Sequence, residues 1–175
     1  MSIEIDVLNG DAGWAEAEAL FDAVWPLHVL KKLPWGDVTF ADADLRVLVR
    51  DAEGSVVCHV GLFRRVITWN GRKMHAGGIG GVATRADARR RGYATLALSA
   101  AIQTLKDERS LDFALLFCEP HNAPFYVARG FKPFDGEIYV EQPGGRVRFV
   151  AIAPYVHELR RLPLKGVIDL NGLPW

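Results

Sequence analysis

The sequence predicts an α+β fold with helices on both faces of a mixed β-sheet (α/β/α layers). Two apolar, strand-like runs at residues 56–69 and 72–84 are joined by Asn70-Gly71, a strong signal for an antiparallel hairpin. A helical pattern follows and leads into another buried-strand run at residues 113–118. A strand–helix–strand unit makes its two strands parallel, with a right-handed crossover. The sheet is therefore expected to combine an antiparallel meander with one parallel pair.

The chain before this unit adds a strand and a helix. Residues 3–7 alternate apolar and polar side chains, which is typical of a strand. Asp11 is suited to cap a helix that Pro26 ends, because proline cannot continue a helix. One face of that helix carries Trp14, Ala17, Phe21 and Val24. Residues 26–44 carry no regular pattern.

Residues 45–50 alternate as a further strand, and a turn at residues 51–54 joins it to the hairpin. The strand at residues 72–84 contains glycines at positions 77, 78, 80 and 81. Glycine weakens a strand and marks a bulge or a close backbone approach. We therefore expect a bulge there, or a ligand that comes close to the backbone.

Two elements follow the strand at residues 113–118. Asn122 is expected to cap a short helix that ends at Gly130. Residues 138–140 and 147–152 are then expected to form a closing hairpin across Pro143-Gly144-Gly145.

The turn that opens the long helix has the character of an anion site. Its residues are Arg89, Arg90, Arg91, Gly92, Tyr93, Ala94 and Thr95. The first turn of a helix leaves about four N–H groups unpaired, and the macrodipole adds positive charge there. Gly92 lets an anion approach those groups, and the arginines raise the local potential. A diphosphate fits such a site. The run from Gly78 to Ala83 formally fits a dinucleotide motif, but it continues a strand instead of opening a helix.

A second group of polar residues lies where the next parallel strand ends. Ligands of α/β sheets bind beyond the carboxyl ends of parallel strands. Those ends are Thr84, followed by the arginine turn, and Glu119 to Asn122. Asn122 and Tyr126 are four residues apart and share one face of the short helix. Both groups therefore face the same crevice.

These two segments resemble a known family. Arg89, Gly92 and Ala94 meet the acyl-CoA motif of the GCN5-related N-acetyltransferases (GNAT), and residues 122–131 resemble that family's second signature. The resemblance implies the GNAT fold, in which the two parallel strands splay apart at a bulge. It also implies acetyl-CoA as co-substrate. Main-chain groups of Val82, Ala83 and Thr84 would hold the pantetheine arm.

The resemblance also assigns catalytic roles. Tyr126 would protonate the departing CoA thiolate, and Asn122 belongs to the CoA site. The amine must lose a proton before its nitrogen attacks the thioester. Glu119 and His121 lie at the correct strand end to take it, and a water chain that ends at a carboxylate is the alternative.

The acceptor segment is similar to that of aminoglycoside 2′-N-acetyltransferases. Trp35 and Asp37 lie in a segment rich in carboxylates, and the likeness extends to a chain that ends in Trp175. We expect a cationic, sugar-like amine between residues 35–44 and Trp175, covered by the two tryptophans. The chain departs from those enzymes at Gly80 and at Leu173-Pro174, where they carry acids.

Two other functions remain open. Residues 59–67 are similar to a stretch of the rhizobial nodulation N-acyltransferases, which would make the acyl group a fatty one. The second alternative is a protein that has lost catalysis and binds CoA as a sensor. The function that we expect is acetyl transfer to a primary amine by direct attack, without a covalent enzyme intermediate.

Composition limits the partners. The 175 residues suit a single domain over residues 1–175, and zero formal charge disfavours nucleic-acid binding. No apolar run approaches the ~20 residues of a membrane span, and no leader pattern starts the chain. Cys58 and Cys118 lie in apolar runs, as expected of reduced thiols in a cytoplasmic protein. We expect a small-molecule acceptor and no metal, and a homodimer remains open.

Overall fold

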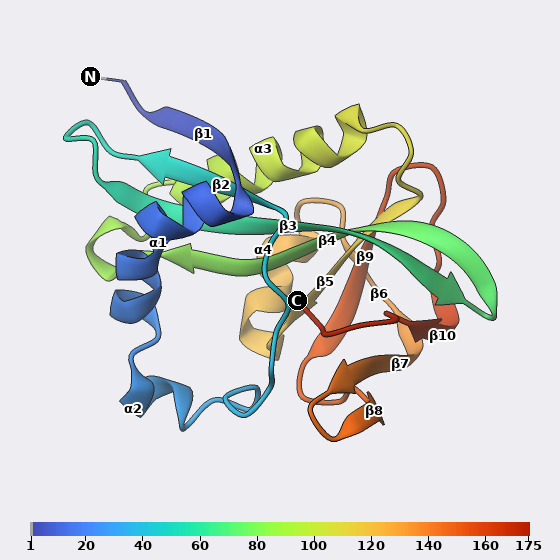
Figure 1. Cartoon of the computed structure of the whole chain (residues 1–175). Coiled ribbons are helices and arrows are strands. Elements are labelled where there is room, and N and C mark those ends of the chain that lie inside the picture. The colour runs from blue at the N-terminus through green and yellow to red at the C-terminus, as the bar shows by residue number, and fades with distance from the viewer. Residues whose placement is uncertain (1) are drawn as a thin grey trace.

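The computed structural model describes residues 2–175 and shows a curved mixed sheet with helices on both faces (Figure 1). The sheet has ten strands among the described residues. They are β1 (Glu4–Asn9), β2 (Leu45–Arg50), β3 (Val56–Trp69), β4 (Arg72–Thr84), β5 (Phe113–Cys118), β6 (Lys132–Pro133), β7 (Asp135–Gln142), β8 (Gly145–Arg148), β9 (Ala153–Glu158) and β10 (Lys165–Asp169). The helical elements are α1 (Gly10–Val24), α2 (Leu27–Leu30), η1 (Ala86–Ala88), α3 (Tyr93–Asp107), η2 (Pro120–Asn122) and α4 (Ala123–Val127).

The central strands pair as the sequence predicted. Strands β3 and β4 form the antiparallel hairpin, and Asn70 and Gly71 both take positive φ angles, of 49° and 79°. Strands β4 and β5 are parallel, with Ala76–Ile79 opposite Phe113–Leu116. Strands β1 and β2 extend the meander beyond β3. The predicted combination of a meander and one βαβ unit is therefore confirmed.

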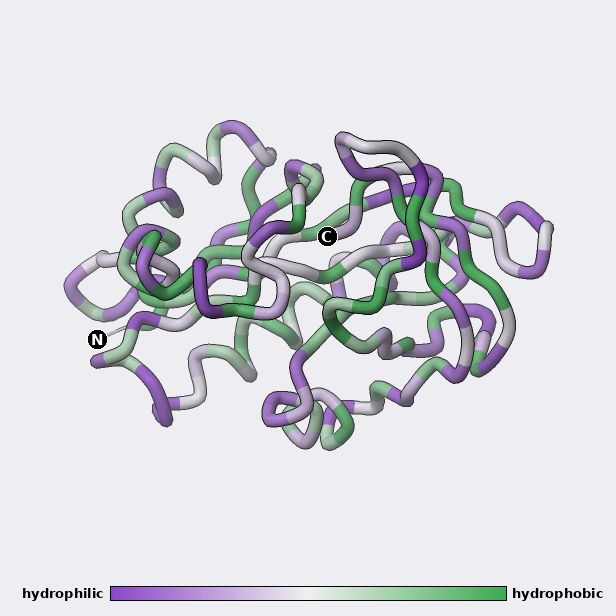
Figure 2. Tube along the Cα trace, turned by 90° about the horizontal axis from the view of Figure 1, so that it is seen from below, coloured by the Kyte–Doolittle hydropathy of each residue, from purple (hydrophilic) through white to green (hydrophobic). Residues whose placement is uncertain are grey.

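Helices α1 and α3 cover opposite faces of strands β2–β4 (Figure 1). The face under α3 is apolar and contains Val47, Val49, Cys58, Val60, Leu62, Ala97, Leu98, Ala101 and Leu105. A second core lies on the other face of the sheet and joins β3, β5, β7 and β10, through Ile67, Phe113, Leu115, Ile138 and Ile168. Hydrophobic stretches accordingly gather in the central strands, while several peripheral loops are hydrophilic (Figure 2).

A bulge in β4 separates the two parallel strands. His59 lies opposite Ala83 and Gly61 lies opposite Gly80, so two residues of β4, Gly81 and Val82, face one residue of β3. Gly81 has a φ of +57°, which glycine adopts without strain. The pairing of β4 with β5 ends at Ile79, just before the bulge. The splayed strands that the family resemblance implied are present.

Two other glycines of β4, Gly78 and Gly80, lie against Trp175, whereas Gly77 lies against Leu105 and Leu111. A Cβ atom on Gly78 would overlap the indole of Trp175, and one on Gly80 would lie 2.8 Å from its carbonyl carbon. The indole stacks on Phe63 at 5.6 Å, and its Nε1 donates to the Leu115 carbonyl at 2.9 Å. The close approach that we expected from a ligand is therefore made at these two positions by the protein itself.

The C-terminal third differs from the prediction. The closing hairpin joins β7 and β8, but β8 ends at Arg148, and after it only the Phe149 N–H still donates to β7, at the Ile138 carbonyl. The strand predicted at residues 147–152 is therefore wrong beyond Arg148. Two unpredicted strands follow. Strand β9 pairs with β5, and β10 lies between β3 and β7. Both are short, and their partners are distant in sequence.

The two predicted caps also differ. Helix α1 begins at Gly10, one residue before Asp11, and the cap is the Asn9 side chain, which accepts the Asp11 N–H at 3.3 Å. Asn122 occupies the cap position of α4, but its side chain makes no capping hydrogen bond, because η2 already leads the chain into the helix.

Candidate active site

A cavity of about 880 Å³ opens where β4 and β5 separate. Its walls come from the end of β4, the start of α3, η2, α4 and the α1–α2 region. Most of the residues predicted for the CoA site and for catalysis line it: Val82, Ala83, Thr84, Arg89, Arg90, Gly92, Tyr93, Ala94, Thr95, Glu119, His121, Asn122 and Tyr126. Arg91 is exposed and is not among the lining residues. The structure thus brings two segments together that lie about 30 residues apart in the chain.

The start of α3 leaves its backbone open to the cavity. Gly92 caps the helix at a φ of +83°, and a Cβ there would meet nothing within 4 Å. The first intrahelical bond is Leu96 N–H to the Gly92 carbonyl, at 3.1 Å, so the N–H groups of residues 93–95 precede it. Arg89 is held at this turn by its Nε, which donates to the Thr84 carbonyl at 3.2 Å. An anion placed here would meet N–H donors and positive charge.

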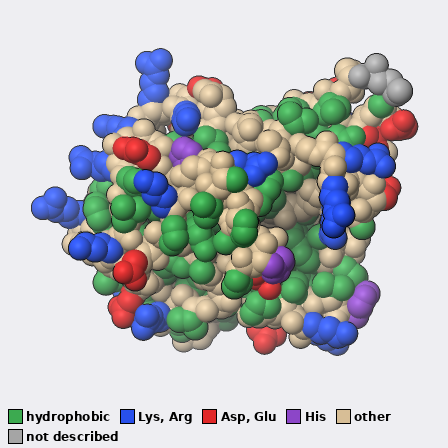
Figure 3. Space-filling model, turned by 180° about the vertical axis from the view of Figure 1, so that it is seen from behind, with side chains coloured by type: hydrophobic (Ala, Val, Ile, Leu, Met, Phe, Trp, Pro, Cys, Tyr) green, Lys and Arg blue, Asp and Glu red, His purple; other side chains and the backbone are tan. Residues whose placement is uncertain are grey.

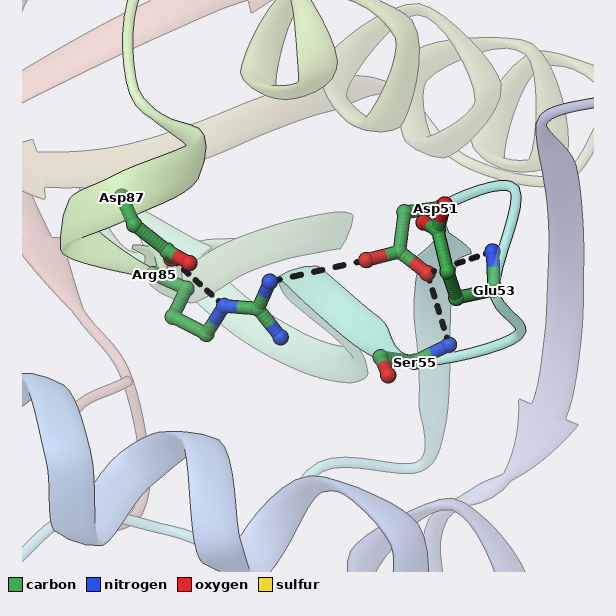
Figure 4. A network of polar contacts seen from close by, with 5 residues as sticks. All are labelled: Asp51, Glu53, Ser55, Arg85 and Asp87. Atoms are coloured by element: carbon green, nitrogen blue, oxygen red, sulfur yellow. Dashed lines mark hydrogen bonds and ion pairs between the residues drawn. The ribbon is translucent and has the colours of Figure 1, made fainter.

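A polar network fixes the segment between β4 and α3 (Figure 4). Arg85 Nε donates to Asp87 at 2.6 Å, and its Nη2 reaches Asp51 at 3.5 Å. The other oxygen of Asp51 accepts the N–H groups of Glu53 and Ser55, at 3.1 and 2.8 Å. The turn after β4 is therefore tied to the turn between β2 and β3.

On the face shown in Figure 3, Lys and Arg side chains are interspersed with Asp and Glu side chains around hydrophobic groups. This mixture agrees with the zero formal net charge of the chain.

Tyr126 is the buried acid candidate. Its side chain is only 7% exposed, and its ring packs edge-on against Phe125 and Phe131. Burial raises the pKa of the phenol far above its usual value, and the thiols of Cys118 and Cys58 raise it further. The phenol therefore stays protonated through the working pH range and can act as a proton donor.

The two cysteines are unsuited to covalent catalysis. Both are free and buried. Burial, and to a lesser degree Glu119, raises the pKa of Cys118 to about 11, and burial also raises the pKa of Cys58. Cys58 lies 3.4 Å from the Thr84 hydroxyl. Because the thiolate is the nucleophile, these thiols are inert at neutral pH, as expected for structural cysteines.

Glu119 lines both the main cavity and a second cavity of about 410 Å³. Its Oε2 lies 3.5 Å from the indole Nε1 of Trp35. The second cavity is bordered by Pro34, Glu119, Pro120, Gly136, Ile138, Arg148, Phe149, Val150, Ala151, Ile152, Ala153 and Pro154. His121 is exposed on η2 and lines only the main cavity. Of the two base candidates, Glu119 is thus the one that faces both cavities.

The predicted acceptor residues do not come together. Trp35, Asp37 and Trp175 line neither of these cavities, although Trp35 contacts Glu119. Asp37 is exposed on the surface. Trp175 is 4% exposed and lies in the second core, so the expectation that its aromatic face covers an acceptor is wrong. That face is already occupied by Phe63 and by the Arg65 guanidinium, whose carbon lies 5.0 Å from the ring centre.

Arg129 is a cavity residue that the sequence did not reveal. Its guanidinium lies 3.8 Å from the ring centre of Phe125 and donates to the Phe125 carbonyl and to the Thr95 hydroxyl, at 2.7 and 2.6 Å. Its Nε is buried without a partner in the described part of the chain. The arginine thereby ties α4 to the first turn of α3. Its role is visible from this contact between two helices that are distant in the sequence, and not from a sequence motif. The apolar wall from Val24, Trp25, Val29 and Leu33 was likewise not predicted.

Neither a metal cluster nor a membrane helix occurs in residues 2–175. No group of three or more His, Cys, Asp or Glu side chains there is placed to hold an ion. No helix in this range is long and apolar enough to cross a membrane.

A sequence model of the acetyltransferase (GNAT) domain matches residues 12–134. The chain belongs to the GNAT acetyltransferase family. No curated protein sequence matches it. Among solved structures, Escherichia coli YhbS in complex with CoA is 19% identical over 97% of this chain and 89% of that one, with a TM-score of 0.60. Escherichia coli ElaA is 18% identical over 90% of this chain and 100% of its own, with a TM-score of 0.63.

A Brucella melitensis GNAT acetyltransferase, solved with acetyl-CoA, shares 14% identity over 75% of this chain and 83% of its own, with a TM-score of 0.54. At such identities the likeness shows the fold. Family and fold together identify the chain as a GNAT acetyltransferase, and two of the three neighbours hold CoA or acetyl-CoA.

Proposed function

We propose that this GNAT protein moves an acetyl group from acetyl-CoA to a primary amine by direct attack. One observation carries the proposal: the open N-terminus of α3 and the buried, neutral phenol of Tyr126 line the same cavity, at the point where β4 leaves β5. The first feature suits a diphosphate, and the second suits a thiolate leaving group.

The diphosphate would lie on the N–H groups of residues 93–95, beside Arg89 and Arg90. The pantetheine arm would run along Val82–Thr84, where β4 no longer has β5 as a neighbour. Pantetheine carries amides, which can pair with an unoccupied strand edge. Arg129, fixed across the first turn of α3, adds positive charge to the same wall.

The reaction needs three proton transfers. The ammonium of the acceptor loses a proton to Glu119, directly or through water, and the free nitrogen attacks the thioester carbonyl carbon. The carbon–sulfur bond then breaks, and Tyr126 gives its proton to the departing CoA thiolate. The nitrogen, which carries one extra proton after the attack, gives it up to the Tyr126 phenolate, directly or through water, and Glu119 releases its proton to solvent. The products are the N-acetylated amine and CoA, and both cysteines stay out of the reaction because they are buried and protonated.

Two acceptor classes compete. The sequence favours a cationic amino sugar, whose positive charge Glu119 can attract, while the Trp35 indole contacts that carboxylate from outside the cavities. The second cavity favours an amine with an apolar body, because Ile138, Phe149, Val150 and Ile152 border it and Glu119 lies on its wall. Arg148 borders the same cavity and would repel a second positive charge.

An amine panel separates these classes. The purified protein is incubated with acetyl-CoA and kanamycin, glucosamine, phenethylamine or octylamine, and free thiol is measured. Thiol release with any of them supports acetyl transfer, and the ranking identifies the class. Replacing acetyl-CoA by palmitoyl-CoA tests the fatty-acyl alternative. If no amine gives turnover but calorimetry shows CoA binding, the chain is a CoA-binding module. If CoA does not bind, the proposal is wrong.

A further inference from the structure

His59 of β3 is a completely buried histidine with both ring nitrogens engaged. Its Nδ1 lies 2.7 Å from the Gly81 carbonyl oxygen, and its Nε2 lies 3.1 Å from Nη1 of Arg46. Arginine can only donate, so Nε2 must be the acceptor and Nδ1 must carry the hydrogen. The ring therefore donates to the Gly81 carbonyl, and Arg46 determines the tautomer.

Arg46 is itself fixed. It is 7% exposed, its Nε donates to the Gly10 carbonyl at 2.9 Å, and its guanidinium carbon lies 5.0 Å from the ring centre of Trp14. The rings of Phe21 and His59 pack edge-to-face, with 4.8 Å between their centres. Phe21 of helix α1 and Arg46 of strand β2 thus both contact the imidazole and hold it in place. A buried polar network of this kind is rigid when its members are satisfied.

Gly81, the partner of His59, is the first residue of the β4 bulge. Its positive φ turns the backbone out of the regular ladder, and Val82, Ala83 and Thr84 follow it along the cavity wall. The direction of the Gly81 carbonyl determines the orientation of the next peptide plane. The hydrogen bond from His59 to that carbonyl therefore also orients the following main-chain groups, which are proposed to hold pantetheine.

We propose that His59, oriented by Arg46, is a positioning residue that fixes the β4 bulge for acyl-CoA binding. It does not line the cavity and acts only through the Gly81 carbonyl. The inference rests on the proposed function for the identity of the ligand. The arrangement of the bulge itself is a property of the free protein.

Two substitutions separate positioning from packing. His59→Asn places an amide nitrogen near the position of Nδ1 and keeps a donor for Gly81, whereas His59→Leu removes it. Losing one hydrogen bond of about 1–1.5 kcal/mol corresponds to about a tenfold effect. In His59→Leu, the Kd of CoA and the KM of acetyl-CoA should therefore rise about tenfold, and the KM of the amine should not change. His59→Asn should recover most of the affinity.

Ile67→Ala is the matched control. Ile67 is also fully buried in β3 but lies opposite Met74, at the far end of the hairpin from the bulge. This variant should lower the melting temperature without changing CoA affinity. If His59→Leu behaves like Ile67→Ala, or if His59→Asn and His59→Leu lose equal affinity, the positioning role is refuted.

Two further measurements do not depend on CoA. Nitrogen NMR of the wild-type ring should show the Nδ1–H tautomer, and the Nε2–H tautomer would overturn the inference. Amide exchange at Val82–Thr84 should accelerate in His59→Leu and remain slow in His59→Asn. If the wild type does not bind CoA, the proposed function fails, but tautomer and exchange still decide whether His59 fixes the bulge.

Discussion

At the scale of single residues, burial gives Tyr126 and His59 their chemistry. Both side chains lose water, and in both the neutral form is favoured. For Tyr126 this preserves a proton donor beside the leaving sulfur. For His59 it preserves a fixed tautomer that donates to the bulge. The effect of each can be measured separately.

Replacing Tyr126 by Phe should lower kcat by about 10²- to 10⁴-fold, because the variant lacks the proton needed as the thiolate leaves. The Kd of acetyl-CoA should change little, since the ring still packs against Phe125 and Phe131. Steady-state kinetics and calorimetry measure the two quantities. Tyr155→Phe, a tyrosine packed against the same core, is the control and should keep full activity. If kcat of Tyr126→Phe falls by less than threefold, Tyr126 has only a packing role.

The His59 ring should make stability depend on pH. Burial, together with the nearby Arg46 charge, lowers the pKa of His59 from 6.5 to about 4, although the bond to Gly81 opposes this. Between pH 6.5 and pH 4, His59 is protonated in the unfolded chain but neutral in the folded protein. The free energy of unfolding therefore falls as pH falls toward 4. The full effect is about 3 kcal/mol.

Urea unfolding of the wild type and His59→Asn at several pH values between 7 and 4.5 measures this contribution. Carboxylates titrate in both proteins, so the difference between the two slopes isolates the histidine. The wild type should lose about 2–3 kcal/mol more than the variant over this range. Parallel slopes would show that His59 is protonated normally in the folded protein.

At the scale of elements, the first turn of α3 is the predicted phosphate site, and Gly92→Glu tests it. The substitution adds bulk and negative charge in front of the N–H groups of residues 93–95, so CoA binding measured by calorimetry should be largely lost. Gly54→Glu is a closely matched control. Gly54 has the same φ of +83° and the same open surroundings, but lies in the turn after β2. Equal binding by both variants would exclude this turn as the diphosphate site.

The elements also show how far sequence reasoning reaches. The hairpin at Asn70-Gly71 and helix α3 were predicted, because their signals are local turns and periodic apolar residues. Strands β9 and β10 were missed because each is defined by pairing with a distant strand. Their own patterns are short and mixed, and long-range pairing overrides local preference in such segments.

The candidate site shows the same limit. The segments around Gly92 and Tyr126 were found because strand ends meet at one crevice, and this geometry is common to α/β sheets. Arg129 and the partner of His59 were not found, because each depends on one contact across elements. The glycines of β4 correctly indicated a close approach, but nothing local identifies Trp175 as the residue that makes it.

At the scale of the whole molecule, the end of the chain joins the halves of the sheet. Besides its contacts with Phe63 and Leu115, the segment at residues 173–175 is held by the Ala41 N–H, which donates to the Pro174 carbonyl at 2.8 Å. Val38, Ala41 and Ala43, which belong to the segment 35–44 that we expected to bind the acceptor opposite Trp175, therefore pack in the same core as Trp175. The two tryptophans predicted to cover one substrate have different surroundings.

Substituting each tryptophan by Ala tests this division. Trp175→Ala leaves a void against Gly78 and removes the bond to Leu115, which should cost about 3–5 kcal/mol and lower the melting temperature by about 10 °C or more. Its KM for the amine should stay close to the wild-type value at temperatures where it is folded.

Trp35→Ala removes the indole beside Glu119 and should raise the KM for the amine, with a smaller loss of melting temperature. Thermal unfolding and amine kinetics on both variants decide the matter. A steep rise of the amine KM in Trp175→Ala, with melting unchanged, would return Trp175 to the acceptor site.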